Sequence, residues 1–272
     1  MKKMKYLAIV FISLSVVVLQ SNNVLAQSTT DIDGWIKQLQ SQNWQERENA
    51  VLNLLSLPAV QKTDNVIKAL IDELERENYK KVYEGEEGEY LSMLLKGVAA
   101  MRDDRAFPLL KKIGAPDGLI QYGDKGVVAI LDNLKRKPTC NEKYYSVRIL
   151  TESLQLKKAG YVAHGTIRQK IKKDMLKMLE ESKHPDKNKN IEWYDYRARE
   201  CARVRFQITR ALGYFAETGD AEVLPYIESL AKHDPYYWVP KGKPDDESNR
   251  KYDVRDEAKT VIDELKAKGI KK

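Results

Sequence analysis

The sequence predicts an all-α protein, built as an α-solenoid of about five to six diverged and irregular helix pairs. Apolar residues recur at helical spacing in nearly every periodic segment, and strand-like alternation is almost absent. The expected helix starts also recur, at intervals of about 40 residues. One amphipathic helix pair cannot bury its own apolar face, so consecutive pairs are expected to stack.

The first 26 residues are expected to form a cleaved signal peptide. Lysines lie among the first five residues, Tyr6–Leu19 is apolar, and Val24-Leu25-Ala26 provides a small-residue cleavage pattern. The apolar run is short for a membrane span, so an uncleaved anchor is the less favoured alternative. We therefore expect an exported protein, periplasmic or secreted, whose residues 27–272 form one helical domain without a membrane span.

The charge balance does not indicate nucleic-acid binding. Removal of residues 1–26 takes away three lysines and no acidic residue, which lowers the net charge from +7 to +4. The charged residues make up 32% of the chain. Such a high fraction suits a protein with many exposed helix faces.

Six residues mark the expected starts of the first helices in each pair. An Asp or Thr at a helix start accepts a hydrogen bond from a free N–H group, and an Asp also complements the positive helix end. The interval after the third residue is short and the one before the sixth is long, which predicts one truncated and one expanded unit. The six residues are Asp31, Asp64, Asp103, Asp124, Thr166 and Asp220.

Four apolar stripes with helical spacing give the predicted core. Each stripe buries one helix face and leaves charged residues outside. They lie within Val66–Leu74, Val127–Leu134, Ile167–Leu179 and Val254–Leu265.

The best-preserved unit is Val204–Leu230, which predicts a helix, a Gly-Asp turn and a helix with Pro in its first turn. The segment Asp103–Leu110 aligns with it, since Asp103 matches Asp220 and Pro108 matches Pro225. A Val-Arg pair recurs in the predicted second helices, with arginines at Arg148, Arg205 and Arg255, and Glu46-Arg47 resembles a degraded first copy.

This unit resembles the HEAT-repeat family, including the HEAT-like repeats first described in phycobilin lyases. The second helix of that family often reads VRxxAxxALGxxGD, and Val204–Leu230 and Val254–Leu265 are similar to it. The resemblance implies an α-solenoid that acts as a binding scaffold. We expect the recurring arginines to join neighbouring repeats rather than to bind a ligand. No Asp stands consistently six residues before them, so a continuous Asp–Arg ladder is not expected.

No motif in the sequence indicates catalysis. The sequence lacks a nucleophile elbow, a phosphate loop, a dinucleotide fingerprint and a zinc-protease motif. The histidines His164, His184 and His233 stand alone, and the acidic run Glu84–Glu89 lacks the pattern of a calcium loop. We therefore expect no enzymatic activity, cofactor or metal.

Two expanded loops, near residues 183–194 and 233–252, are the predicted sites of partner binding. The second loop carries Tyr236, Tyr237 and Trp238, and the first carries Trp193 and Tyr194. Aromatic side chains on a long loop are well suited to anchoring a partner. The alternative, equally favoured for the second loop, is that its aromatic residues fold back over the last repeat. For Trp193 and Tyr194 the alternative, which is favoured, is that they pack against a helix start.

The two cysteines leave another choice open. An exported protein can keep a disulfide, and a Cys140–Cys201 bond would close about 60 residues. The alternative is a buried thiol at Cys201 and an exposed one at Cys140.

Three functional hypotheses follow. The favoured one is a scaffold that binds a protein partner through a solenoid face and the expanded loops. The second, which rests on the resemblance alone, is a chaperone-like or lyase-like accessory factor for a cofactor-bearing client. The third is an anionic-polymer binding module that uses the basic tract Lys183–Lys189.

Overall fold

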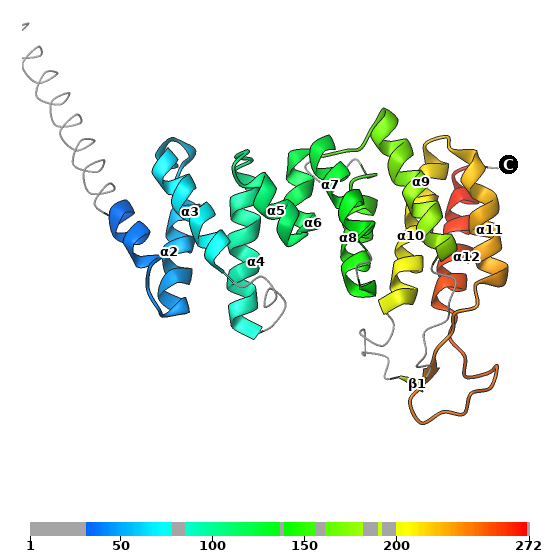
Figure 1. The fold of residues 1–272 in the computed structure, drawn as a ribbon. Helices are drawn as coiled ribbons and strands as arrows, with labels where there is room; N and C mark the ends of the chain where they lie inside the picture. Colours follow the sequence, from blue (N-terminus) through cyan, green and yellow to red (C-terminus); the bar gives the residue numbers. More distant parts are fainter. Residues whose placement is uncertain are drawn as a thin grey trace, which may run out of the picture. The chain divides into compact units, whose positions relative to one another are not determined.

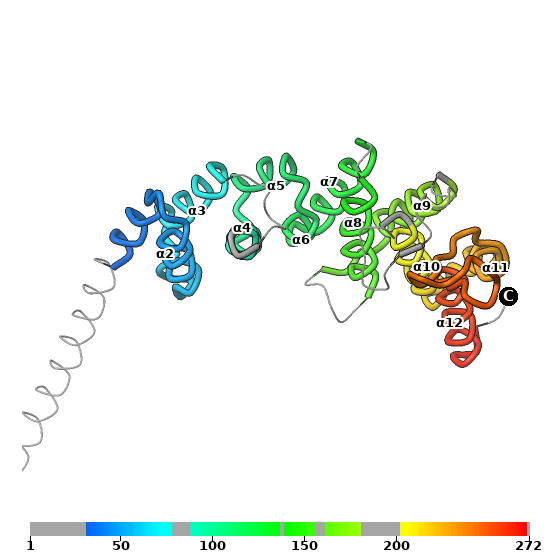
Figure 2. Tube along the Cα trace, turned by 90° about the horizontal axis from the view of Figure 1, so that it is seen from below, coloured from blue at the N-terminus to red at the C-terminus, as the bar shows by residue number. Residues whose placement is uncertain are grey.

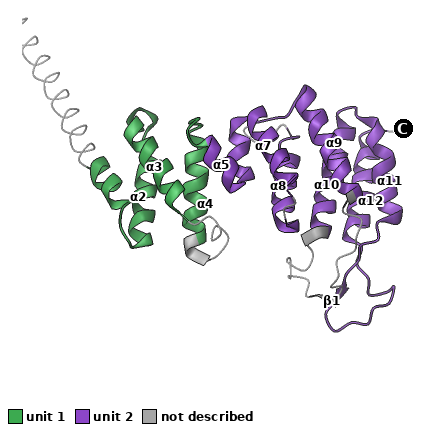
Figure 3. Ribbon diagram, viewed as in Figure 1, with its two compact units in different colours: residues 1–106 green, residues 107–272 purple. Residues whose placement is uncertain are grey.

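The computed structural model is predominantly helical (Figures 1 and 2), which confirms the predicted all-α class. It divides into two compact units, residues 1–106 and 107–272 (Figure 3). The structure describes residues 31–77, 85–136, 139–155, 161–181, 190–191 and 200–270. The expected signal peptide therefore lies outside the described residues. Within the described ranges, no helix has the length and apolar character required to cross a bilayer.

The first unit is a cluster of helices around an aliphatic core. Residues 31–38 are helical, and α4 packs against both α2 and α3. Leu54 of α2, Leu74 of α3 and Leu94 of α4 are fully buried between them. The remaining elements are α2 (Trp44–Ser56), the 3₁₀ turn η1 (Ala59–Gln61), α3 (Asp64–Arg76) and α4 (Gly85–Ala100).

The second unit begins with two short helices and continues with three longer helix pairs among its described residues. Its elements are α5 (Phe107–Ile113), α6 (Pro116–Leu119), η3 (Ile120–Tyr122), α7 (Asp124–Leu134), α8 (Cys140–Glu152), α9 (Gly165–Glu181), β1 (Asn190–Ile191), α10 (Glu200–Glu217), η5 (Ala221–Val223), α11 (Leu224–His233), β2 (Val239–Pro240) and α12 (Asp253–Ala267).

The three longer pairs are stacked side by side. Helix α10 packs between α8 and α12, while α7 packs on α8 and α9, α9 on α10, and α11 on α12. The second helices of the pairs, α8, α10 and α12, thus form one layer. The first helices, α7, α9 and α11, form a second layer that packs against it (Figure 2). The apolar stripe of α10, which includes Ile208, Leu212 and Phe215, is fully buried in this stack.

The predicted helix starts agree with the observed pairs, but three of the predicted cap residues lie inside their helices. Asp64 and Asp124 are the first residues of α3 and α7, and the N-cap positions are held by Thr63 and Gly123. Their charges still lie in the first turn, at the positive helix end. Thr166 also lies inside its helix, because α9 begins at Gly165.

The predicted truncated unit is the pair formed by α5 and α6, whose helices have 7 and 4 residues. Pro108 and Pro225 each occupy the second position of their helices, where a missing N–H costs nothing. The Gly-Asp turns need glycine, since Gly123 and Gly219 have φ angles of 62° and 100°.

The two expanded loops meet through a parallel pair of two-residue strands that the sequence pattern did not predict. Asn190 pairs with Val239, and Ile191 pairs with Pro240. A two-residue strand is too short for a detectable alternation of apolar and polar residues. In Figure 1 this contact lies at the end of the pairs formed by α9 to α12.

Two glycines allow close packing in the second unit, and they should differ in their tolerance of alanine. A Cβ atom at Gly126 would lie 1.7 Å from the carbonyl oxygen of Leu119, whereas one at Gly213 would lie 2.8 Å from Cγ1 of Val261. We expect G126A to lower the free energy of unfolding by about 1–3 kcal/mol, because overpacking outweighs the better helix propensity of alanine. The measurement is urea denaturation followed by circular dichroism.

For G213A the expected loss is smaller, because the crowded atom is a side-chain methyl group of Val261 rather than a backbone oxygen. In the double variant G213A/V261A the loss should be smaller than the sum of the two single losses, because V261A removes the crowded methyl group. A G126A protein as stable as the wild type would contradict this account of the contact.

Candidate functional site

A buried ion pair joins α10 to the segment after α11. The Nε atom of Arg205 lies 3.0 Å from Oδ2 of Asp234, and the two side chains are only 1% and 2% exposed. A second guanidinium nitrogen lies 3.5 Å from Oδ1 of the same carboxylate. Such a two-point contact fixes the geometry of both side chains as well as compensating their charges.

Asp234 also organises the start of the long loop that follows α11. Its Oδ1 atom accepts a hydrogen bond from the backbone N–H of Tyr236 at 2.9 Å, and its carbonyl oxygen accepts one from Nε of Arg255 at 2.7 Å. The guanidinium of Arg205 lies 5.6 Å from the centroid of the Tyr236 ring. The loop is therefore held between α10 and α12.

The structure places two of the three aromatic anchors predicted in the second loop in the core. Tyr236 is 2% exposed and Trp238 is 9% exposed, and Nε1 of Trp238 donates to Oδ1 of Asp253 at 3.0 Å. Trp238 and Lys251 also exchange two backbone hydrogen bonds, which close the loop on itself. Of the two alternatives in the sequence, the structure has the one in which the loop covers the last helix pair. Trp193 and Tyr194 lie outside the described residues.

Tyr237 is the member of this aromatic group that stays half-buried. Its hydroxyl donates to Oδ2 of Asp245 at 3.1 Å, and its ring lies 4.3 Å from the guanidinium of Arg250. Arg250 in turn pairs with Asp245 at 2.8 Å. These contacts make Tyr237 part of the internal bracing of the loop.

Breaking the buried ion pair should be costly. R205A leaves the Asp234 carboxylate buried without its main counter-charge, so we expect a loss of about 3–5 kcal/mol in the free energy of unfolding. The matched control is R148A, because Arg148 is 37% exposed and lies 4.0 Å from Asp117. Exposed pairs of this kind contribute about 0–1 kcal/mol. Equal losses in the two variants, measured by urea denaturation, would contradict the assigned role of Arg205.

Asp220 and Asp124 also contact residues that are distant in the sequence. Asp220 accepts hydrogen bonds from Nζ of Lys172 at 3.0 Å and from Nε2 of Gln169 at 3.3 Å, both on α9. Burial acts to raise the pKa of Asp220, but the Lys172 ammonium lowers it below its usual value. Asp124 accepts a hydrogen bond from the hydroxyl of Tyr161.

Asp103 acts within its own turn. It accepts the backbone N–H of Arg105 at 2.9 Å and pairs with the same guanidinium. Arg105 also reaches Asp64 at 2.9 Å, so this turn is tied to the start of α3.

In the first unit, Arg47 occupies the place that the degraded Glu46-Arg47 copy indicated. Its guanidinium lies 3.1 Å from Glu73 and 2.8 Å from Glu77, both at the end of α3 or just after it. The hydroxyl of Tyr90, from α4, donates to Glu73 at 2.6 Å. Burial raises the pKa of Glu73, and it also raises the pKa of Tyr90. The sequence analysis did not identify Glu73 or Tyr90 as partners, because neither lies in a recurring motif.

A groove on the layer of second helices is the strongest candidate for a partner site in the second unit. Its volume is about 290 Å³, near the lower end of ligand-sized cavities. It is lined by a stripe of α10 that is separate from the core stripe, by one residue of α8 and by the first residue of α12. The lining residues are Tyr144, Ala202, Arg203, Phe206, Gln207, Arg210 and Asp253.

Cationic and aromatic groups alternate in this groove. The guanidinium of Arg203 lies 3.7 Å from the centroid of the Tyr144 ring, and that of Arg210 lies 4.7 Å from the Phe206 ring. Arg210 also pairs with Glu257 of α12 at 2.5 Å. Sequence analysis missed this groove, although the spacing of residues 203, 206 and 210 places them on one helix face.

The part of the chain that the structure describes contains no candidate metal site, because no group of three His, Cys, Asp or Glu side chains in it is suited to hold a metal ion. His164 and His233 are exposed. His184 and the basic tract Lys183–Lys189 lie outside the described residues, and of the acidic run only Glu89 has a described side chain, which is exposed.

Cys140, the first residue of α8, takes part in a disulfide. The side chain of Cys201, in the first turn of α10, lies outside the described ones. Because α8 packs along α10 and the sequence has two cysteines, the Cys140–Cys201 bond stays our prediction for this bridge.

Peptide mapping under non-reducing conditions should recover the Cys140 peptide linked to the Cys201 peptide. The C140S variant should lose about 4 kcal/mol of stability, the value expected for a closed loop of about 60 residues in the chain-entropy model. Added reductant should lower the wild type to the level of C140S and leave C140S unchanged. An intermolecular linkage in the peptide map would contradict the prediction.

Comparison with known proteins gives little further information. No protein-family model matches the chain, and no curated protein matches it significantly. Among solved structures, an engineered protein from the Northeast Structural Genomics Consortium aligns at 18% identity over 87% of this chain and 97% of its own, with a TM-score of 0.26. At this TM-score the match carries no argument about fold or function.

Proposed function

We propose that this chain is an exported, non-enzymatic HEAT-like α-solenoid scaffold that binds a protein partner. The observation that carries the proposal is the groove between α8, α10 and α12, with its alternating arginine and aromatic side chains. Arg, Tyr and Phe are enriched in the cores of protein–protein interfaces, and Arg and Tyr are also frequent among the residues that dominate binding energy.

The stacked pairs support a scaffold in a second way. The layer formed by α8, α10 and α12 places equivalent helix faces side by side, so a partner can contact several units at once. The recurring arginines are used internally, since Arg205 and Arg255 hold Asp234 and its backbone. The surface proposed for recognition is the α10 stripe of Arg203, Phe206 and Arg210, which lines the groove.

In this proposal the aromatic residues of the second loop have a supporting role. Tyr236 and Trp238 are buried, so they act in this proposal as supports that hold the start of α12 at the groove. Asp253, which accepts the Trp238 N–H, is itself part of the groove lining.

A photo-crosslinking amino acid in place of Phe206 tests the proposal in the native host. We expect it to capture one defined protein, because the aromatic replacement keeps the groove and brings the reactive group to the bound surface. The matched control carries the same amino acid in place of Val60, which is 90% exposed and lies on a different unit.

In the protein that carries the crosslinking amino acid at position 206, the additional substitutions R203A and R210A should lower the yield of the crosslinked complex at least tenfold. The circular dichroism spectrum should stay unchanged. Capture of the same proteins from position 60, or a yield that does not respond to the arginine variants, would contradict the assigned surface.

A further inference from the structure

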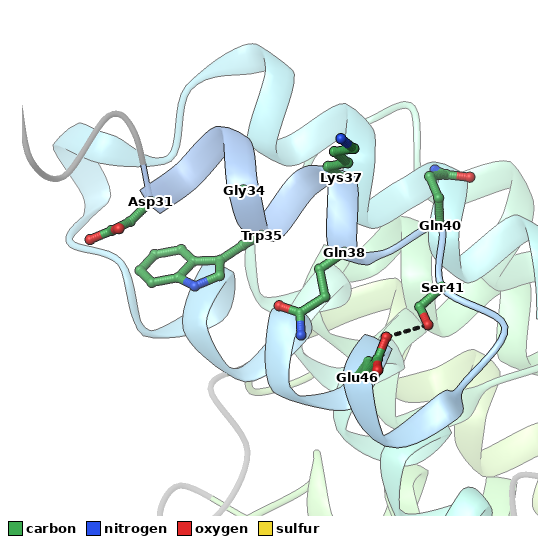
Figure 4. A pocket seen from close by; sticks show the side chains of 8 residues that line it. All are labelled: Asp31, Gly34, Trp35, Lys37, Gln38, Gln40, Ser41 and Glu46. Atoms are coloured by element: carbon green, nitrogen blue, oxygen red, sulfur yellow. Dashed lines mark hydrogen bonds between the residues drawn. The ribbon is translucent and has the colours of Figure 1, made fainter.

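The first unit contains a hollow of its own, which shares no residue with the partner groove of the second unit. Its volume is about 680 Å³, and it is broadly open to solvent. It lies between the helix at residues 31–38 and the first turn of α2 (Figure 4). The lining residues are Asp31, Gly34, Trp35, Lys37, Gln38, Gln40, Ser41 and Glu46.

Trp35 is the central feature of this hollow. It is half-buried, and Figure 4 shows its indole projecting from the helix on the same side as Asp31 and Gln38. These residues lie four positions before and three positions after Trp35, which places all three on one helix face. The indole therefore presents a flat apolar surface that is bordered by a carboxylate and an amide.

The rim on the α2 side is held in place by hydrogen bonds. Oγ of Ser41 donates to Oε2 of Glu46 at 2.5 Å and accepts the backbone N–H of Asn43 at 3.1 Å. Oε1 of Gln40 accepts a hydrogen bond from Nη1 of Arg76 at 2.8 Å. These polar groups are thus positioned before any ligand arrives, which reduces the ordering cost of binding.

The segment that forms this rim, residues 39–42, is hydrogen-bonded to two arginines that pair with a buried glutamate. Arg47 donates to the carbonyl oxygens of Ser41 at 3.1 Å and Gln42 at 3.3 Å, and Arg76 donates to that of Leu39. Both arginines also pair with Glu73, whose side chain is 1% exposed. The hollow is therefore built on a rigid base.

The mixture of groups selects the chemical class of the ligand. On the side of the indole, Asp31 and Glu46 accept hydrogen bonds, and the amide of Gln38 both donates and accepts them. An ion would need groups of one kind, whereas sugar hydroxyls both donate and accept. The C–H groups on one face of a sugar ring carry partial positive charge, which matches the negative face of an indole.

We propose that the hollow around Trp35 binds a sugar unit of a glycan. The ring stacks on the indole of Trp35, and its hydroxyl groups contact Asp31, Gln38 and the Ser41–Glu46 pair. This site is independent of the partner groove on the second unit, so each can fail without the other.

The test applies the full chain to an array of immobilised oligosaccharides that contain neutral hexoses, N-acetylhexosamines and uronic acids. We expect binding to a set of neutral glycans, with little dependence on salt, because no net charge is exchanged. W35A should weaken this binding at least tenfold, which corresponds to about 1.4 kcal/mol. W35F should keep part of it, because the smaller ring still stacks.

The matched control is W44A. Trp44 is also half-buried and belongs to the same unit, but it does not line the hollow. We expect W44A to bind as the wild type does, and circular dichroism must show that both variants keep their helices.

Three results would overturn the proposal. They are a lack of binding to every glycan on the array, equal losses in W35A and W44A, and a preference for tetramethylammonium over all glycans in a fluorescence titration of Trp35. The last result would assign the hollow to organic cations, which an indole beside two carboxylates also attracts.

Discussion

Buried arginine–carboxylate pairs between consecutive helices are the contacts on which the rest of this structure depends. Arg47 with Glu73 in the first unit and Arg205 with Asp234 in the second have the same form. In each, an arginine near the start of a second helix reaches a carboxylate 26 or 29 residues later in the chain. A buried charge is tolerated only when its partner and hydrogen bonds are present, so each pair specifies one arrangement of its neighbours.

The two pairs organise different surfaces. Arg47 and Arg76, held by Glu73, fix the loop that forms the rim of the Trp35 hollow. Asp234, held by Arg205, fixes the loop that carries Tyr236 and Trp238, and Trp238 holds Asp253 at the edge of the partner groove. The candidate sites are therefore peripheral to the charge pairs but depend on them for their geometry.

Helix content and helix order could be predicted because they depend on local periodicity. The stripes around Leu70, Ile130, Ile171 and Val261 are buried as expected, and the first helix of each pair begins close to the residue that marked it. The caps were wrong at Asp64 and Asp124 because a shift of one residue leaves the charge in the first turn and changes little in the pattern.

The sites were less predictable, for a physical reason. Tyr236 and Trp238 have the composition of an exposed anchor, yet their burial depends on Asp234 and Asp253, which are brought to them by the packing of α11 and α12. Trp35 and Phe206 carry no motif at all, and only the neighbouring helix turns them into the wall of a hollow.

The pairing of β1 with β2 affects how the C-terminal end of the chain can unfold locally. Stacked helix pairs generally fray from their ends, where each unit has only one neighbour. Here the loop after α11 is joined to β1, which precedes α10, and it also holds α12 through Trp238 and Asp253. Helix α12 is thus connected, through the loop, to a segment that precedes α10. We expect local opening at the C-terminal end to involve α10 to α12 together rather than α12 alone.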